Sequence, residues 1–306
     1  MTHLVLLGPT ASGKSAVALE LARSNPGVEL VSVDSMQVYR GMDVGTAKPT
    51  HAEQAEVRHH LIDLVDPDDR FTVVRFATEA ASVLAGIERR GHTAVLVGGT
   101  GLYLQAVIGD LQPPGEWPDA RVGIEASDPA TLHTRLAALD PVAAARIEPG
   151  NSRRLVRALE VTIGSGRPFS SFGPGVGTYP QTERFVMIGL WLPRAVVAQR
   201  IDQRVRDMIG SGLVEEVRRL TPTLGPTARQ ALGYKEVLAH VERGEDLRDA
   251  IEQTARRTRE FSRRQRSWFR RDPRIRWHGT ADDPARLLPG VQVELDRITD
   301  GAKSAP

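Results

Sequence analysis

Four continuous apolar runs separate the helical segments of this 306-residue chain. Runs without polar alternation are typical of strands that are buried on both faces of a parallel sheet. The runs cover residues 4–8, 28–35, 93–101 and 184–192. Helical periodicity lies between them at 15–24 and 71–91, where Gly91 is placed to end the helix. This alternation predicts an α/β fold, a parallel sheet core with helices on both faces.

The stretch between the third and fourth runs differs in composition from the rest. Residues 121–167 have helical patterns, and the flanking segments 111–120 and 170–180 are rich in Pro and Gly. We therefore predict a helical insertion domain within a discontinuous core domain, and we expect the insertion to contact a large anionic partner. The alternative is that these helices pack on the same core. The predicted bounds are 1–114 and 184–306 for the core domain and 115–183 for the insertion.

Three further segments have weaker patterns. Residues 194–271 are helical with a break between Pro222 and Pro226, and HHLID at 59–63 is predicted to be a loop. The tail after residue 272 is expected to be irregular.

A glycine turn with Lys-Ser follows the first apolar run. LVLLGPTASGKS matches G-x-x-x-x-G-K-[ST] at Gly8, Gly13, Lys14 and Ser15. The backbone N–H groups of such a loop cradle phosphates, Lys14 adds a full charge, and Ser15 is suited to ligate Mg²⁺. The sequence therefore predicts a core like that of the P-loop NTPases. Most such loops bind ATP or GTP, but the pattern specifies a diphosphate and not the group that carries it.

Other candidate residues follow the second and third apolar runs. Asp34 ends the second run and Thr100 follows the third, so both are expected beside the phosphate loop at the carboxyl edge of the sheet. Asp34 is suited either to hold Mg²⁺ or to act as a general base. His59 and His60 have no further metal ligands at useful spacing, which favours a structural or substrate-contact role.

Positive charge is clustered although the total is nearly balanced, with 40 Lys and Arg against 38 Asp and Glu. Residues 256–271 contain eight arginines and one glutamate. On a helix, five of these arginines fall on one stripe: Arg256, Arg259, Arg263, Arg266 and Arg270. A separate stripe is suited to packing and consists of Ile251, Thr254, Thr258, Phe261, Gln265 and Trp268. Smaller sets are Arg153, Arg154 and Arg157, and Arg200, Arg204 and Arg206. Together they indicate a groove for a large polyanion.

Two absences limit the possible locations and chemistry. The chain has no cysteine, which excludes disulfides, thiol catalysis and Cys-ligated zinc. It begins without a signal-peptide pattern and has no apolar run long enough to span a bilayer. We therefore expect a cytoplasmic protein with no membrane partner.

The order of several motifs resembles that of the tRNA dimethylallyltransferases. These are GPTASGKS, DSMQVYRGMDVGTAKP, HHLID, VGGTGLYL, RRLVRALE, GLVEEV, QALGYKE and RRQRSWFR, which together span about residues 4–278. The resemblance implies transfer of a dimethylallyl group from its diphosphate to N6 of adenosine 37, beside the anticodon of a tRNA. It also implies that the phosphate loop holds the prenyl diphosphate, with Mg²⁺ as cofactor, in an enzyme that works as a monomer.

The resemblance assigns roles to individual residues. It implies that the diphosphate lies on the loop formed by Gly8, Pro9, Thr10, Ala11, Ser12, Gly13, Lys14 and Ser15, with Ser15 as the metal ligand. Asp34 accepts the proton of the attacking amine, and Thr100 and Arg204 contact the diphosphate from the opposite side. The implied tRNA contacts are Asp34, Ser35, Met36, Gln37, Thr100, Arg121, Arg153, Arg154, Arg157, Gln230, Gly233, Tyr234, Lys235, Arg263 and Arg264. The segment between Arg121 and Thr131 is short for the family, and the zinc finger of the eukaryotic members is absent.

Two other functions fit parts of the sequence. A P-loop small-molecule kinase explains the first hundred residues but leaves the arginine-rich helix unexplained. A free adenine-nucleotide isopentenyltransferase shares the phosphate loop and Asp34 but needs no RNA-binding insertion. An RNA-binding protein with a nucleotide switch fits poorly, because no guanine-specificity motif is present.

Overall fold

The structure is a computed structural model that describes residues 1–109, 114–173 and 177–303. The chain forms two compact units, a core unit of Met1–Ile108 with Tyr179–Pro306 and a helical unit of Gly109–Thr178. Residues 111–113 and 174–176 of the predicted Pro- and Gly-rich segments lie outside the described residues.

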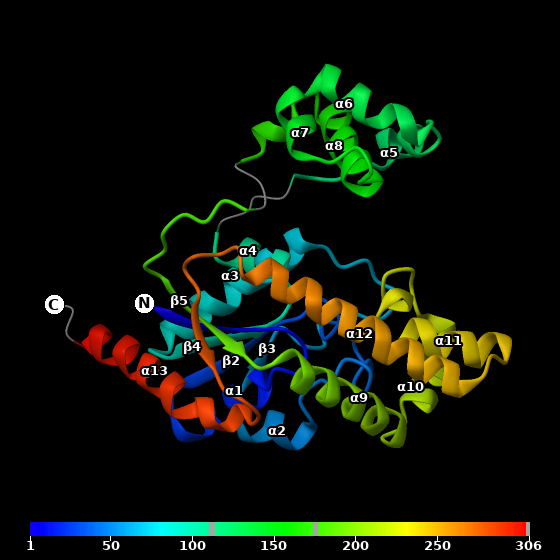
Figure 1. The fold of residues 1–306 in the computed structure, drawn as a ribbon. Helices are drawn as coiled ribbons and strands as arrows, with labels where there is room; N and C mark the ends of the chain where they lie inside the picture. The colour runs from blue at the N-terminus through cyan, green and yellow to red at the C-terminus, as the bar shows by residue number, and fades with distance from the viewer. Residues whose placement is uncertain (110–113, 174–176, 304–306) are drawn as a thin grey trace. The chain divides into compact units, whose positions relative to one another are not determined.

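A six-stranded parallel sheet lies at the centre of the core unit (Figure 1). Its strands are β1 (His3–Leu7), β2 (Val28–Val33), β3 (His59–His60), β4 (Thr93–Gly98), β5 (Phe185–Trp191) and β6 (Arg276–Gly279). Their order is β3-β2-β4-β1-β5-β6, and Leu4 of β1 pairs with Val95 on one side and Val186 on the other. The α/β fold and the four apolar strands are confirmed.

Two edge strands were not predicted. HHLID contributes β3 instead of a loop, and the tail after 272 contains β6 and a long helix instead of irregular chain. The prediction failed because each edge strand is short and its residues are polar or half-exposed, so neither has an apolar run.

Alternate residues of the strands face two different hydrophobic clusters. Leu4 and Leu6 pack with α1 (Lys14–Ser24) and α13 (Leu288–Lys303), whereas Val5 and Leu7 face the opposite side. That opposite side is covered by α3 (Val73–Arg89), α10 (Leu213–Leu220) and α11 (Tyr234–Arg243). A continuous apolar strand is needed because both faces are covered.

The remaining helices of the core unit are α2 (His51–Glu56), α4 (Gly101–Val107), α9 (Arg194–Gly210) and α12 (Leu247–Phe269). Helices α9 and α12 lie side by side (Figure 1) and share a small cluster that contains Ile201 and Ala255. This pairing brings the arginine-rich helix to the carboxyl edge of the sheet, where Gln265 of α12 meets the phosphate loop.

The helical unit has its own core. It contains α5 (Pro118–Glu125), α6 (Leu132–Leu139), α7 (Pro141–Arg146) and α8 (Ser152–Ser165), which pack around Leu136 and Leu155. Within the described parts of the chain, no helix combines the length and apolarity needed to cross a membrane.

Candidate active site

The phosphate loop joins β1 to α1. Ala11 has a φ of 61° and Gly13 a φ of 85°, so the backbone turns sharply before the helix begins at Lys14. The first N–H groups of α1 have no acceptor within the helix, and they lie at the positive end of its dipole. A Cβ at Gly13 would come 2.3 Å from Cγ of Pro284, so only glycine fits there. The loop is therefore preformed for an anion.

Gln265 of α12 fixes the loop to the end of β4. Its Oε1 accepts from the backbone N–H of Thr10 at 2.8 Å, and its Nε2 donates to the carbonyl of Gly99 at 2.9 Å. The Thr10 N–H is thus already satisfied, and the donors left for a diphosphate are those nearer the helix start. A Cβ at Gly99 would lie 2.4 Å from Nε2 of Gln265, which explains the glycine in the VGGTG turn.

Two cations and one carboxylate face each other at the mouth of the loop. Burial and the nearby Arg204 lower the pKa of Lys14 to about 8, whereas Asp34 raises it. Burial also lowers the pKa of Arg204, again opposed by Asp34. Lys14 of the loop and Arg204 of α9 therefore form a site with two cations that lack a full complement of negative charge, which a bound anion would supply.

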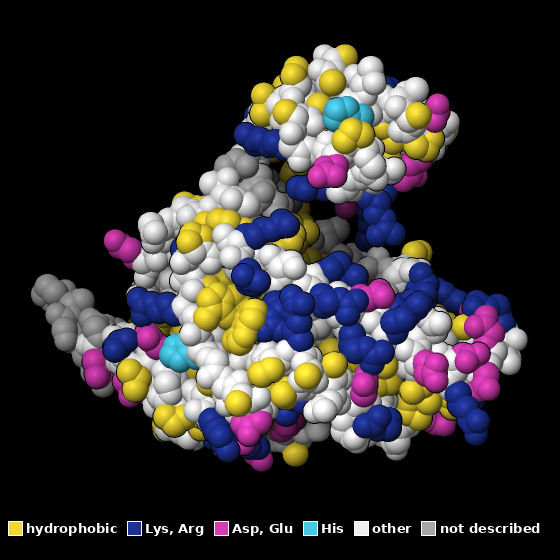
Figure 2. Space-filling model, in the orientation of Figure 1, with side chains coloured by type: hydrophobic (Ala, Val, Ile, Leu, Met, Phe, Trp, Pro, Cys, Tyr) yellow, Lys and Arg dark blue, Asp and Glu magenta, His cyan; other side chains and the backbone are white. Residues whose placement is uncertain are grey.

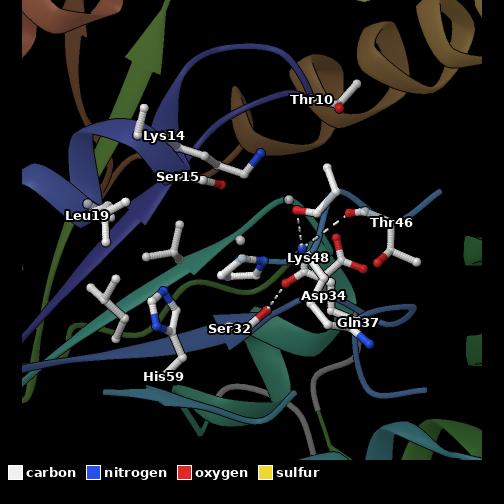
Figure 3. A pocket seen from close by; sticks show the side chains of 18 of the residues that line it. Thr10, Lys14, Ser15, Leu19, Ser32, Asp34, Gln37, Thr46, Lys48 and His59 are labelled. Carbon is white, nitrogen blue, oxygen red and sulfur yellow. Dashed lines mark hydrogen bonds between the residues drawn. The ribbon is translucent and has the colours of Figure 1, made fainter. Parts of the chain in front are cut away.

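The site consists of two cavities that share a wall. The first, of about 260 Å³, is lined by Lys14, Ser15 and Asp34 and reaches an apolar end at Leu19 and Val97. In Figure 3, Thr10, Lys14 and Ser15 lie on one side of this cavity and Ser32, Asp34 and Gln37 on the other. We call it the donor cavity, because it contains the phosphate loop.

The second cavity, of about 340 Å³, lies on the other side of the same wall. Thr10, Asp34, Thr46, Arg204 and Phe261 line both cavities. The second also contains the predicted contact residues Ser35, Met36, Thr100, Gln230 and Arg264. We call it the acceptor cavity. Its hydroxyl, amide and aromatic side chains suit a flat polar ring.

The loop after β2 is held by its own side chains. The carboxylate of Asp34 accepts from the N–H of Met36 at 2.8 Å, and the amide oxygen of Gln37 accepts from Ser32 at 2.7 Å. The Gln37 nitrogen donates to the carbonyls of Thr46 and Ala47. Gln37 therefore positions the loop with its amide oxygen and nitrogen, while the second carboxylate oxygen of Asp34 has no hydrogen-bond partner among the described residues.

A buried glutamate anchors the next loop, residues 43–48. Glu216 of α10 accepts from the N–H groups of Asp43, Val44 and Gly45 at 2.8 to 3.0 Å and from the hydroxyl of Tyr234 at 2.5 Å. Burial and Glu216 raise the pKa of Tyr234. These contacts explain the GLVEEV and GYKE motifs as supports of the acceptor cavity.

Tyr234 and Gly233 do not face that cavity. The Tyr234 side chain is fully buried, so its predicted tRNA contact is not available to its ring or hydroxyl, and Gly233 forms the positive-φ start of α11. Lys235 is exposed and donates to Gln230 at 3.0 Å. Arg263 does not line the acceptor cavity but a different groove, between α9 and α12.

The other predicted arginines belong to the helical unit. Arg121 pairs with Glu125 and Glu160, and Arg157 pairs with Glu160 and donates to two carbonyls of the same unit. Arg153 and Arg154 are exposed. Arg121 and Arg157 therefore stabilise the fold, whereas Arg153 and Arg154 have no ion pair with any residue that the structure describes.

Several site residues were missed by the sequence reasoning. Phe261, Thr258 and Gln265 were assigned to a packing stripe, yet the first two line the acceptor cavity and Gln265 holds the phosphate loop. The available signal was the presence of two threonines and a glutamine in a stripe that an ordinary helix would fill with aliphatic residues. His59 also lines the donor cavity, whereas His60 binds the buried carboxylate of Glu29 at 2.6 Å.

No group of three or more His, Cys, Asp or Glu side chains that could hold a metal occurs among the described residues. The donors present are the exposed Ser15 hydroxyl and the Asp34 carboxylate, both on the donor cavity. Mg²⁺ is usually held by one or two protein oxygens together with substrate phosphates and water. These two residues fit such a site.

Comparison with known proteins gave matches over nearly the whole chain. The IPP transferase family model matches residues 37–272, and the isopentenyl transferase model matches residues 1–67. A tRNA dimethylallyltransferase of Kineococcus radiotolerans is 46% identical over 314 residues, with 98% of each chain covered. Another, of Geobacter metallireducens, is 46% identical over 287 residues, covering 90% of this chain and 92% of that protein.

Solved structures are similar in fold. The full-length tRNA isopentenylpyrophosphate transferase from Bacillus halodurans has a TM-score of 0.70 and 36% identity, covering 98% of this chain and 97% of that one. A eukaryotic dimethylallyltransferase acting on tRNA has a TM-score of 0.81 and 26% identity, covering 100% of this chain and 80% of that one.

Proposed function

The chain belongs to the IPP transferase family, and we propose that it is a tRNA-modifying prenyltransferase that transfers a dimethylallyl group from dimethylallyl diphosphate to N6 of adenosine 37. The products are N6-(dimethylallyl)adenosine 37 and diphosphate. The observation that carries the proposal is the shared wall of the two cavities. Asp34 and Arg204 face a phosphate-binding loop on one side and a pocket suited to a base on the other.

The donor is held by charge and by backbone dipoles. Its diphosphate lies at the start of α1, where Lys14 and Arg204 supply two cations. The depressed pKa of Lys14 rises when the diphosphate binds, because the anion favours the charged form. As the bond from carbon 1 of the allyl group to the diphosphate oxygen breaks, these groups stabilise the charge on the leaving group.

Asp34 prepares the acceptor. The N6 amine of adenine is a weak nucleophile because its lone pair is delocalised into the ring. The open carboxylate oxygen of Asp34 accepts one N6 proton while the new bond from N6 to carbon 1 forms. Such general base catalysis contributes about 10²- to 10⁴-fold to the rate. Thr100 caps α4 without a side-chain capping hydrogen bond, so its hydroxyl remains able to contact base or diphosphate.

Mg²⁺ is the proposed cofactor, held by Ser15 and the diphosphate with Asp34 nearby. When bound, it neutralises charge on the diphosphate and so makes it a better leaving group.

The target adenine must leave its stacked position in the anticodon loop to enter the acceptor cavity, at a cost of a few kcal/mol. Splayed loop bases are bound by stacking on aromatic and arginine side chains, and Phe261 and Arg264 supply one of each.

The proposal has three further parts. Arg153 and Arg154 of the helical unit contact the tRNA, the enzyme acts as a monomer, and it is located in the cytoplasm.

A donor and acceptor exchange experiment tests the function. Purified protein with Mg²⁺ is incubated with labelled dimethylallyl diphosphate and an anticodon stem-loop that carries unmodified A37. Parallel reactions replace the RNA by AMP or the donor by ATP. Label in the stem-loop and not in AMP supports the proposal. Label in AMP alone would indicate a free-nucleotide enzyme, and turnover of ATP without prenyl transfer would indicate a kinase.

A further inference from the structure

Positive charge on the surface does not select the base that enters the acceptor cavity. Figure 2 shows Lys and Arg side chains gathered on the face where α9 and α12 lie. Such charges bind backbone phosphates, which are the same at every nucleotide. Adenine differs from guanine at position 6 of the ring, where it has a donating amine instead of an accepting carbonyl. A side chain that selects adenine through this group must therefore present an acceptor.

Three residues on the wall shared by the two cavities have side-chain oxygens. They are Thr10, Asp34 and Thr46. In Figure 3, Asp34 and Thr46 lie on the same side of the donor cavity, and Thr10 lies on the opposite side, on the phosphate loop. Asp34 has a role in the proposed function as the base. Thr46, which is half-buried, has none so far.

The hydroxyl proton of Thr46 is already used within the fold. Its Oγ1 donates to the carbonyl of Met42 at 2.6 Å, and the carbonyl of Asp43 lies 3.5 Å from the same atom. The oxygen keeps its lone pairs, so toward a ligand it acts as an acceptor and not as a donor. An amine at the shared wall therefore meets two acceptors, Asp34 and Thr46, whereas a carbonyl there would face both without a proton between them.

The backbone of Thr46 is anchored on both sides. Its carbonyl accepts from Nε2 of Gln37 at 3.2 Å, and the N–H of Gly45 donates to Glu216 at 3.0 Å. The next residue, Ala47, has a φ of 47°, a left-handed conformation that is strained for a residue other than glycine. Such strain persists only where the surrounding contacts hold it, and it is typical of functional sites. The position of the Thr46 hydroxyl is therefore fixed before any ligand binds.

We propose that Thr46 is a second contact of the target amine, an inference that rests on the proposed function. Its Oγ1 accepts a hydrogen bond from the N6 proton that remains in the product, while Asp34 takes the proton that leaves. The bond from N6 to carbon 1 forms, the bond from carbon 1 to the diphosphate oxygen breaks, and one proton passes from N6 to Asp34. Two acceptors fix the orientation of the amine and of its lone pair, as a productive approach to carbon 1 requires.

Binding of two RNAs without donor tests this contact in the full chain. One anticodon stem-loop carries adenosine at position 37, and the other carries purine riboside, which lacks the 6-amino group. Thr46→Val removes the acceptor oxygen with little change in shape, and Thr46→Ser keeps it. Thr46→Ala also removes it and replaces the valine variant if that protein does not fold.

Thr78→Val is the matched control. Thr78 is exposed on α3, lines neither cavity, and its hydroxyl also donates to the carbonyl four residues before it, at 3.2 Å. Fluorescence anisotropy gives the ratio of the affinities for the two RNAs. Thermal unfolding checks that each variant is folded. A purely structural role of Thr46 would weaken the binding of both RNAs equally and leave this ratio unchanged.

We expect the preference for adenosine over purine riboside to fall about fivefold in Thr46→Val and in Thr46→Ala, as for the loss of one hydrogen bond. Thr46→Ser should rescue the preference, and Thr78→Val should keep it. The single-turnover rate of prenyl transfer to the A37 stem-loop should fall by a similar factor in Thr46→Val and recover in Thr46→Ser.

An unchanged preference in Thr46→Val would overturn the contact. Weaker binding of dimethylallyl diphosphate together with an unchanged preference would assign Thr46 to the donor instead. In both cases the proposed function stands if wild type prenylates the A37 stem-loop. If wild type transfers no prenyl group to that RNA, the proposed function fails whatever preference the variants show.

Discussion

Replacement of Glu216 by glutamine tests how the acceptor cavity is held. Glu216 is 6% exposed and accepts four hydrogen bonds, three from the backbone of residues 43–45 and one from Tyr234. A glutamine has one acceptor oxygen, which can satisfy about two of these donors, and its NH₂ group faces the others. Each buried donor left without an acceptor costs about 1–3 kcal/mol.

The free energy of unfolding of the core unit should therefore fall by about 2–5 kcal/mol in Glu216→Gln. For a unit of this size, that corresponds to a drop of roughly 5–15 °C in the thermal midpoint. The adjacent Glu215→Gln is the matched control, because Glu215 is exposed and changes there are usually within about 0.5 kcal/mol. Circular dichroism during heating measures both variants.

The activity of Glu216→Gln should fall as well, because Gly45 and Thr46 line the acceptor cavity. A Glu216→Gln protein as stable as Glu215→Gln would refute the reasoning, since the four donors would then be satisfied in another way.

The other predictions concern the loop and the shared wall. Asp34→Asn should slow prenyl transfer about 10²- to 10⁴-fold with donor affinity retained, and a single-turnover rate within tenfold of wild type would contradict its role as base. Because the pKa of Lys14 is about 8 instead of 10.5, the empty folded protein binds fewer protons than the unfolded chain between these values, so stability should rise with pH across this window. In Lys14→Met, the thermal midpoint should no longer rise with pH, and stability at pH 7 should be higher than in wild type. Calorimetry should detect no donor binding to this variant. A thermal midpoint that still rises with pH in Lys14→Met would show that another group causes the rise. In wild type, donor affinity should fall as pH increases above 8, and a flat profile to pH 9.5 would exclude a need for the charged form. Gln265→Leu leaves the Thr10 N–H and the Gly99 carbonyl without partners, so it should lower stability by about 2–4 kcal/mol and weaken donor binding, and denaturation that matches wild type would contradict this.

The sequence was sufficient for the parts of the fold that depend on local pattern. Strands covered on both faces are continuous apolar runs, so β1, β2, β4 and β5 could be predicted, and the strand–glycine–helix pattern located the phosphate loop. Edge strands β3 and β6 have no such pattern.

The supports of the site could not be predicted, because they join residues that are distant in sequence. Gln265 reaches Thr10 across 255 positions, and Glu216 reaches the loop at Asp43 across 173 positions. Local periodicity carries no information on such pairs. Charge alone was equally ambiguous. Arg157 and Arg259 belong to the arginine sets that predicted a polyanion groove, but both are paired with carboxylates of the fold.

The central claim is that one base is modified at the wall shared by the two cavities. The most direct measurement incubates wild type and Asp34→Asn with dimethylallyl diphosphate and an A37 stem-loop, digests the RNA to nucleosides, and maps the modified position by mass spectrometry. The account predicts one dimethylallyl group on N6 of A37 with wild type and a loss of about 10²-fold or more in its rate of formation with Asp34→Asn. Modification at another nucleotide, or an equal rate in the two proteins, would contradict it.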